Sequence, residues 1–102
     1  MRKKLPTRRA STNEDFIHNG MEYTMTIGEY EDGKPGEVFV SAKKCDTAVD
    51  HIAKDCSVIL SHSLQHGIDM NLIAKSMMAD ENQEPASVAG VAVRKLVELS
   101  AT

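Results

Sequence analysis

The feature that most constrains the fold is a change of hydrophobic period near residue 42. Residues 21–27 (MEYTMTI) alternate apolar and polar side chains without a break, which is the pattern of a half-buried strand. The stretch 31–36 (EDGKPG) is dense in turn residues, and its Asp-Gly pair favours a hairpin into a return strand over residues 37–42. After this hairpin the apolar residues recur at helical spacing, so the chain passes from strands to helices.

The helical pattern predicts one long helix over residues 47–66. Asp46 or Thr47 is suited to cap its start, and Gly67 is suited to end it in the left-handed conformation. The side that we expect to face the core has i, i+3, i+4 and i+7 spacing and comprises Val49, Ile52, Ala53, Cys56, Ile59, Leu60 and Ser63.

Two shorter helices are expected next, with Asp69 and Ser87 as their caps and the polar loop 80–86 between them. The predicted fold class is α+β: an antiparallel β-hairpin followed by a long helix and two shorter helices, in two layers. A two-stranded ribbon is marginal in water and leaves both strand edges open. We therefore expect two copies to pair into a homodimer.

Charge divides the chain unevenly. The protein has 102 residues and a net charge of −3, which suits a single small domain. Residues 1–12 contain no acidic residue, so the basic side chains there are unbalanced, and we interpret residues 1–16 as a flexible basic arm before a single domain at 17–102. The residues of the arm that could bind an anion are Arg2, Lys3, Lys4, Arg8 and Arg9. Nucleic-acid binding through this arm is one alternative function, but a solvated tail explains it better.

No apolar run reaches the length of roughly 20 residues that a membrane span needs, and the first residues lack the apolar centre of a signal peptide. We expect a cytoplasmic bacterial protein without a membrane partner.

One constellation could bind a metal. His62 and His66 are four residues apart in the predicted long helix, so both project from one side of it. A third ligand would have to come from Asp55 or Cys56, and no His-Glu-x-x-His motif is present. A small metal-dependent enzyme is therefore a second alternative, although two polar surface histidines are the interpretation we favour. No residue is assigned a catalytic role.

Four stretches in order carry a family resemblance: residues 5–9 (LPTRR), 28–33 (GEYEDG), 36–40 (GEVFV) and 59–68 (ILSHSLQHGI). Together they resemble the TSCPD domain, which occurs at the C-terminal end of adenosylcobalamin-dependent (class II) ribonucleotide reductases and in small stand-alone proteins. The motif positions of functional interest are Glu37, Phe39, Gln65 and Gly67, with Phe39 expected to be an apolar anchor of its strand.

The motif that names the family is not kept in this sequence. The Thr-Ser-Cys-Pro-Asp sequence that names the family corresponds here to residues 86–90 (ASVAG), in which only Ser87 is kept. The resemblance implies a stand-alone accessory or regulatory module for deoxyribonucleotide synthesis, which binds a protein or a nucleotide and is not a catalyst by itself. It implies a ribonucleotide reductase large chain as partner, with adenosylcobalamin belonging to that parent enzyme and no cofactor bound by this chain.

Overall fold

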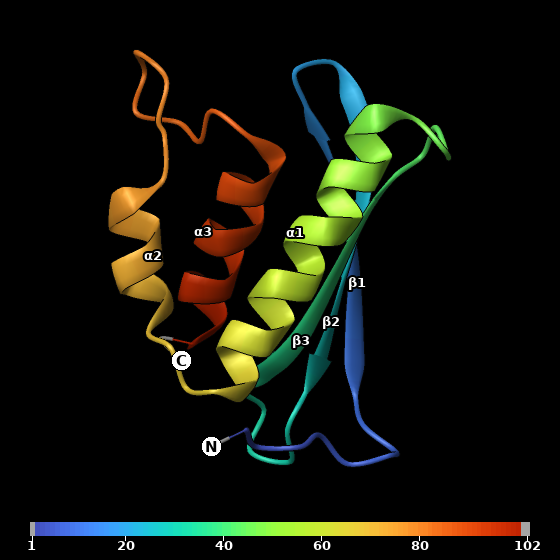
Figure 1. Ribbon diagram of the computed structural model, residues 1–102, viewed down its shortest axis with the longest axis vertical. Helices are drawn as coiled ribbons and strands as arrows, with labels where there is room; N and C mark the ends of the chain where they lie inside the picture. The colour runs from blue at the N-terminus through green and yellow to red at the C-terminus, as the bar shows by residue number, and fades with distance from the viewer. Residues whose placement is uncertain (1, 101–102) are drawn as a thin grey trace.

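The computed structural model describes residues 2–100 and shows an α+β fold, as predicted (Figure 1). A three-stranded antiparallel sheet is followed by three helices. The strands are β1 (Ser11–His18), β2 (Met21–Glu29) and β3 (Pro35–Ala42), and the helices are α1 (Ala48–Gln65), α2 (Met70–Ser76) and α3 (Val88–Ser100). None of the helices within residues 2–100 has the length and the hydropathy needed to cross a membrane.

The predicted hairpin is formed by β2 and β3, which pair in antiparallel register with Ile27 opposite Val38 and Met25 opposite Val40. These four side chains are buried, so the alternation in the sequence marks the side of the sheet that faces the core.

The sheet contains a third strand that the sequence analysis did not predict. β1 begins at Ser11, so residues 11–16 belong to the sheet and not to the expected basic arm. A tight turn joins β1 to β2, in which Asn19 and Gly20 both have positive φ angles, of 50° and 78°. On the inner side of β1 the ring of Phe16 stacks on Tyr23 of β2, with 5.5 Å between centroids.

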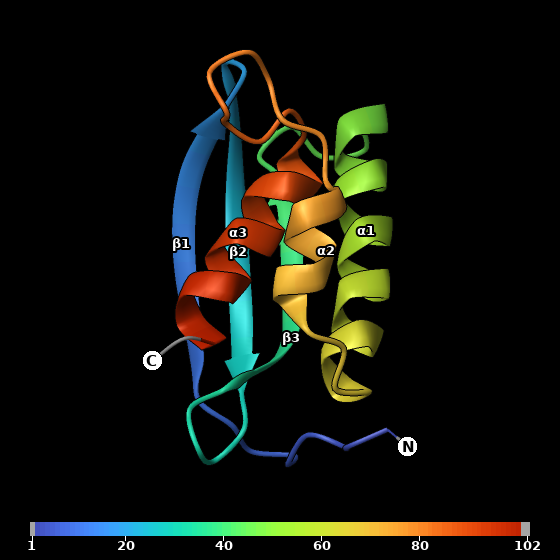
Figure 2. The ribbon, with the colours of Figure 1, turned by 90° about the vertical axis from the view of Figure 1, so that its left-hand side faces the viewer.

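The helices cover one side of the sheet (Figures 1 and 2). Helix α1 runs along β3, α3 crosses the sheet, and α2 packs on α3. The centre of the core lies between the sheet and α3, where Met25, Val38, Val93 and Leu96 are fully buried.

Of the two caps predicted for α1, Thr47 is the one used, and the caps predicted for α2 and α3 are confirmed. The Thr47 hydroxyl accepts a hydrogen bond from the Asp50 amide at 3.2 Å, and Asp69 caps α2 in the same way. The Ser87 hydroxyl accepts from the Gly90 amide at 3.1 Å at the start of α3. Gly67, with φ of 77°, follows the end of α1 in the left-handed conformation.

The predicted orientation of α1 is only partly right: Ala53 and Leu60 are buried as expected, but three β-branched residues are not. Val49, Ile52 and Ile59, expected to face the core, are exposed by 37%, 61% and 66%. The buried positions of the helix are Asp50, Ala53, Ser57, Leu60 and Gln65.

The backbone groups on the edge of β3 explain why polar residues of α1 face the sheet. Side chains of α1 hydrogen-bond the backbone of alternate β3 residues, and they do so along the length of the strand. The contacts are Ala42 N to Asp50 Oδ1 at 3.0 Å, Val40 N to Ser57 Oγ at 2.8 Å, Val38 N to Ser61 Oγ at 2.9 Å, and Gln65 Nε2 to Gly36 O at 3.0 Å. The edge of β3 is thus occupied by the chain's own helix, and the expectation of two open strand edges does not hold there.

Candidate functional site

The basic N-terminal segment, residues 2–9, crosses the end of the molecule where β2 leads into β3 and where α1 ends (Figures 1 and 2). The amide of Lys3 donates to the Gln65 carbonyl at 2.7 Å, and the Tyr30 hydroxyl donates to the Lys3 carbonyl at 2.5 Å. The segment is therefore bonded to the domain through its backbone, unlike the flexible arm of the sequence analysis. We call the surface formed by residues 2–9, the β2–β3 turn and the end of α1 the N-terminal surface.

Gln65 connects the N-terminal segment to the sheet. Its amide nitrogen donates to the Gly36 carbonyl of β3, and its amide oxygen accepts a hydrogen bond from Arg2 Nε at 2.5 Å. Gln65 is buried, and a buried amide needs hydrogen-bond partners, which these two bonds provide at both of its ends. Arg2 and Lys3 also place positive charge at the C-terminal end of α1, where the helix dipole favours cations.

Tyr30 and Gly36 form the floor under the segment. The Lys3 ammonium lies 4.5 Å from the centroid of the Tyr30 ring, a cation–π arrangement, and burial raises the pKa of the Tyr30 phenol. A Cβ atom on Gly36 would lie 2.5 Å from Leu5 Cδ2 and 2.6 Å from Tyr30 Cε2. The absence of a side chain at position 36 therefore lets Leu5 approach the strand.

Glu37 holds the other end of the segment. Its carboxylate accepts two hydrogen bonds from the Arg9 guanidinium, at 2.5 and 3.2 Å, and Arg9 also donates to the Pro6 carbonyl. The Glu37 side chain lies over Gly28 of β2, where a Cβ atom would collide with it. Two residues of the family motifs, Gly28 and Glu37, thus serve to fix a third, Arg9.

Two basic residues of the segment remain available. Lys4 and Arg8 have no hydrogen-bond or ion-pair partner within residues 2–100. Lys4 borders a groove of about 450 Å³ whose opposite wall carries Glu31 and Asp32 of the β2–β3 turn. Arg8 borders a shallow hollow on the outer side of the sheet. The N-terminal surface thus offers charges of both signs to a ligand or partner.

Phe39 does not anchor the core. It lies on the outer side of the sheet, where it is 53% exposed beside Thr26 on the neighbouring strand. The outer side of β2 and β3 is otherwise polar at its exposed positions, and the Thr26 hydroxyl donates to Asn13 on β1. An exposed phenyl ring on such a surface is available to a partner.

The histidine pair lies at the end of α1, and His66 directly follows Gln65, whose carbonyl accepts from the Lys3 amide. His62 and His66 are both exposed on α1, as is Asp55, and Cys56 is half-buried. Across residues 2–100 no group of three His, Cys, Asp or Glu side chains is placed to hold a metal ion.

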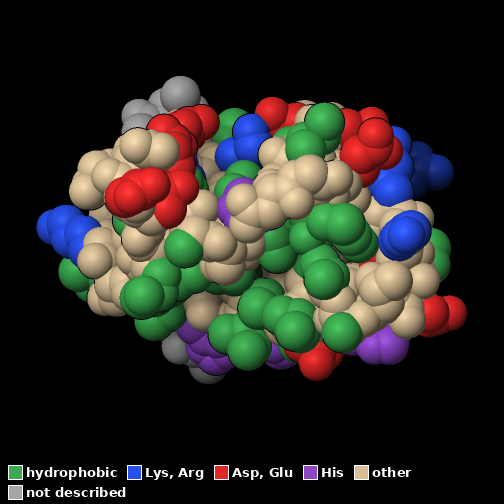
Figure 3. Space-filling view, turned by 90° about the horizontal axis from the view of Figure 1, so that it is seen from above, with side chains coloured by type: hydrophobic (Ala, Val, Ile, Leu, Met, Phe, Trp, Pro, Cys, Tyr) green, Lys and Arg blue, Asp and Glu red, His purple; other side chains and the backbone are tan. Residues whose placement is uncertain are grey.

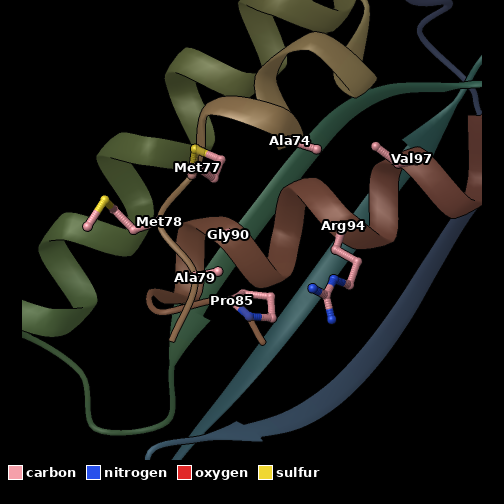
Figure 4. A pocket seen from close by; sticks show the side chains of 8 residues that line it. All are labelled: Ala74, Met77, Met78, Ala79, Pro85, Gly90, Arg94 and Val97. Atoms are coloured by element: carbon pink, nitrogen blue, oxygen red, sulfur yellow. The ribbon is translucent and has the colours of Figure 1, made fainter. Parts of the chain in front are cut away.

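A separate pocket of about 260 Å³ lies between α2, the loop after it and α3 (Figure 4). Its lining is mostly apolar, with Met77 and Val97 on two sides and Arg94 at its border. The Arg94 guanidinium is engaged by Glu84 at 2.8 Å and by the Gln83 carbonyl at 3.0 Å, so it fastens the loop. Ser87, the one kept residue of the motif that names the family, is used here as the cap of α3.

A comparison with protein families shows which family this chain belongs to. The model of the TSCPD domain matches residues 1–96. The chain belongs to the TSCPD domain family. The match includes both the N-terminal segment and the elements that bind it.

Curated relatives of this TSCPD chain are long enzymes. A vitamin B12-dependent ribonucleotide reductase of Rhodopirellula baltica is 32% identical over 72 residues, which are 71% of this chain and 7% of the relative. Enzymes of the same name from Bradyrhizobium diazoefficiens and Agrobacterium fabrum are each 29% identical, over 69% and 68% of this chain and 6% and 5% of their own lengths. The chain thus spans only a small part of these relatives. No solved structure matches it.

Proposed function

We propose that this TSCPD chain is an accessory or regulatory module of vitamin B12-dependent ribonucleotide reduction, and that it acts by binding and not by catalysis of its own. The observation that carries the proposal is the family match over residues 1–96, together with relatives named as that reductase. The matched part is a few per cent of the enzyme, which is the share expected of a module attached to a larger catalytic body.

The N-terminal surface supports a binding role. Residues from all four stretches that carry the family resemblance meet there: Leu5 and Arg9, Gly28 and Tyr30, Gly36 and Glu37, and Gln65. Their hydrogen bonds fix the N-terminal segment, and the fixed segment presents Lys4 and Arg8. In this proposal the partner is the reductase large chain, which contacts Lys4 and Arg8 through acidic groups.

Adenosylcobalamin is assigned to the large chain in this proposal. The hollows of the N-terminal surface are open and bordered by charged side chains, which does not suit a large corrin ring.

The test is a binding measurement with a reductase large chain from which its own TSCPD region has been removed. We expect light scattering to show a complex of the two chains, and reductase activity to change when the module is added. Lys4→Glu combined with Arg8→Glu should weaken the complex at least about tenfold, because the charge at the contact is reversed. Lys44→Glu is the matched control, since Lys44 is exposed away from this surface. The proposal would be refuted if the large chain formed no complex with the module and its activity did not change.

The Lys4→Glu, Arg8→Glu variant and a His62→Ala variant test the two alternative functions. Binding to single-stranded DNA that falls steeply with salt and is lost in the Lys4→Glu, Arg8→Glu variant would support a nucleic-acid binder instead. One zinc ion per chain that is lost on His62→Ala would support a metal-dependent enzyme. We expect neither result.

A further inference from the structure

The helical side of the molecule has an apolar surface that nothing within residues 2–100 covers. Five large aliphatic residues there are between 49% and 75% exposed: Ile52 and Ile59 of α1, Ile68 before α2, Leu72 of α2, and Met78 after it. Figure 3 shows hydrophobic side chains gathered in a band across the lower half of the view, with histidines along its border. We call the surface of these five residues the α1–α2 face.

We propose that the α1–α2 face is the contact between two copies of this chain, with the two α1 helices antiparallel about a twofold axis. This inference stands independently of the proposed function. It also differs from the pairing through strand edges expected from the sequence, because α1 itself occupies the edge of β3.

The area of the face agrees with a dimer. Its five side chains expose on the order of 500–600 Å² per chain, and each partner of a standard interface buries about 800 Å² including its polar rim. Exposed aliphatic residues scattered singly are normal, and a patch of about 300–600 Å² is the largest that a typical monomer carries and is often functional.

The spacing along α1 suits a second copy. Ile52 and Ile59 are seven residues apart, so they lie on one stripe of the helix, two turns from each other. A twofold axis midway between them, beside Cys56, sets Ile52 of one copy on Ile59 of the other, and the reverse. One stripe therefore forms two equivalent contacts, as a twofold interface requires.

The polar groups at the two ends of α1 are complementary in this arrangement, as hydrogen-bond acceptor and donors. Asp46 is exposed just before the helix, where His51 Nε2 lies 3.6 Å from its carboxylate, and His62 and His66 are exposed near the helix end. Antiparallel pairing brings Asp46 of one copy opposite the His62–His66 pair of the other, twice by symmetry. It also sets the two helix dipoles head to tail. Asp55, near the axis, meets its own copy, so its carboxylates repel each other across the contact.

The experiment is the mass of the full chain by light scattering over a range of concentrations. We expect twice 11.2 kDa at high concentration and dissociation on dilution. Ile59→Glu should raise the dissociation constant at least about a hundredfold, because it buries a charge at the centre of the contact. Val58→Glu is the matched control. Val58 is also exposed, by 56%, but it lies on the stripe of Lys54 and Gln65, whose side chains bond Asp50 and the Gly36 carbonyl.

Two further variants test the geometry. Asp55→Asn should tighten the dimer, because it removes the repulsion near the axis. In a Cys45→Ser background, a short bismaleimide should join Cys56 to Cys56 of the second copy, and Ile59→Glu should abolish this product. A chain that stays monomeric at all concentrations would overturn the proposal. A dimer that is unaffected by Ile59→Glu, or equally weakened by Val58→Glu, would place the contact elsewhere and would also overturn it.

Discussion

The two sides of helix α1 depart from the usual arrangement, although Ala53 and Leu60 are buried in the core. The side against the sheet carries Asp50, Ser57, Ser61 and Gln65, whose side chains hydrogen-bond the backbone of β3. The side away from the sheet carries Ile52 and Ile59, which are largely exposed. A helix on a small domain normally buries its aliphatic residues and exposes its polar ones.

The backbone of the edge strand explains the polar side. The outward N–H groups of Val38, Val40 and Ala42 would face an apolar helix without partners if α1 were turned the other way, at a cost of about 1–3 kcal/mol for each buried group. Ser61, Ser57 and Asp50 accept these three N–H groups and remove this cost, and Gln65 donates to the Gly36 carbonyl on the same edge. Among residues 2–100 no buried side-chain nitrogen or oxygen lacks a partner.

Helical spacing makes the match between helix and strand feasible. Ser57, Ser61 and Gln65 are four residues apart, about 6 Å along the helix, and the strand residues they bond are two apart, about 6.6 Å along the strand. The comparison of the two sides teaches that a helix beside a strand edge is oriented by hydrogen-bonding demand, and that its apolar side is then left for another contact.

The largest expected effect follows from removing the hydroxyls of the polar side. Ser57→Ala should destabilise the protein by about 1–3 kcal/mol and Ser61→Ala by a similar amount, because each leaves a β3 amide unpaired. Urea denaturation at pH 7 measures both. Ser63→Ala is the control, because the Ser63 hydroxyl bonds only the Ile59 carbonyl of its own helix. Equal midpoints for all three variants would contradict the arrangement.

Asp50 should make the polar side sensitive to acid. A hydrogen bond from Lys54 and those from the Ala42 and Asp46 amides hold the pKa of Asp50 below its usual 3.8, against the opposing effect of burial. A group with a lowered folded pKa contributes stability above its unfolded pKa, and this stability is lost as the pH falls through the folded pKa. The contribution is therefore complete at pH 7 and disappears in the region below pH 3.8.

Asp50→Asn tests this sign. The variant should be less stable than the native chain at pH 7, and the difference in urea midpoint should shrink as the pH is lowered below about 4. Asp55→Asn is the control, at protein concentrations where the chain is monomeric, because Asp55 is exposed on the same helix without a partner in residues 2–100. A difference for Asp50→Asn that stays constant from pH 7 to pH 2.5 would show that the charge is not involved.

The hairpin, the helices and their caps were predictable because their signals are local. Alternation in β2, the Asp-Gly turn, and the caps Thr47 and Ser87 each depend on residues within a few positions of one another. β1 gave no such signal, since Glu14 and His18 occupy its inner side. Their partners, Lys95 and the Pro85 carbonyl, are 81 and 67 residues away along the chain.

The sequence indicates which residues belong to the candidate site but not which of them contact one another. Glu37 and Gln65 were singled out by the family resemblance, but their partners Arg9 and Arg2 lie 28 and 63 residues away and had been interpreted as solvated. The spacing of Ser57, Ser61 and Gln65 also indicates the orientation of α1, because three serine or amide side chains on one helix stripe can hydrogen-bond an edge strand. The hydrophobic pattern places Ala53 and Leu60 inward correctly, but it also places Val49, Ile52 and Ile59 inward, and these are exposed.

The smallest expected effect is the one that separates the two orientations of α1 most sharply. With Ile59 inward, Ile59→Ala would cost about 2–5 kcal/mol, as for other buried aliphatic residues. In the structure Ile59 is 66% exposed, so at concentrations where the chain is monomeric the change should stay within about 0.5 kcal/mol, with the better helix propensity of alanine offsetting part of it. Leu60→Ala is the neighbouring control. Leu60 is buried, and its truncation should show the full cost of a core residue. Equal losses for the two variants, measured by urea denaturation in dilute protein, would mean that Ile59 packs against the core and that α1 has no free apolar side.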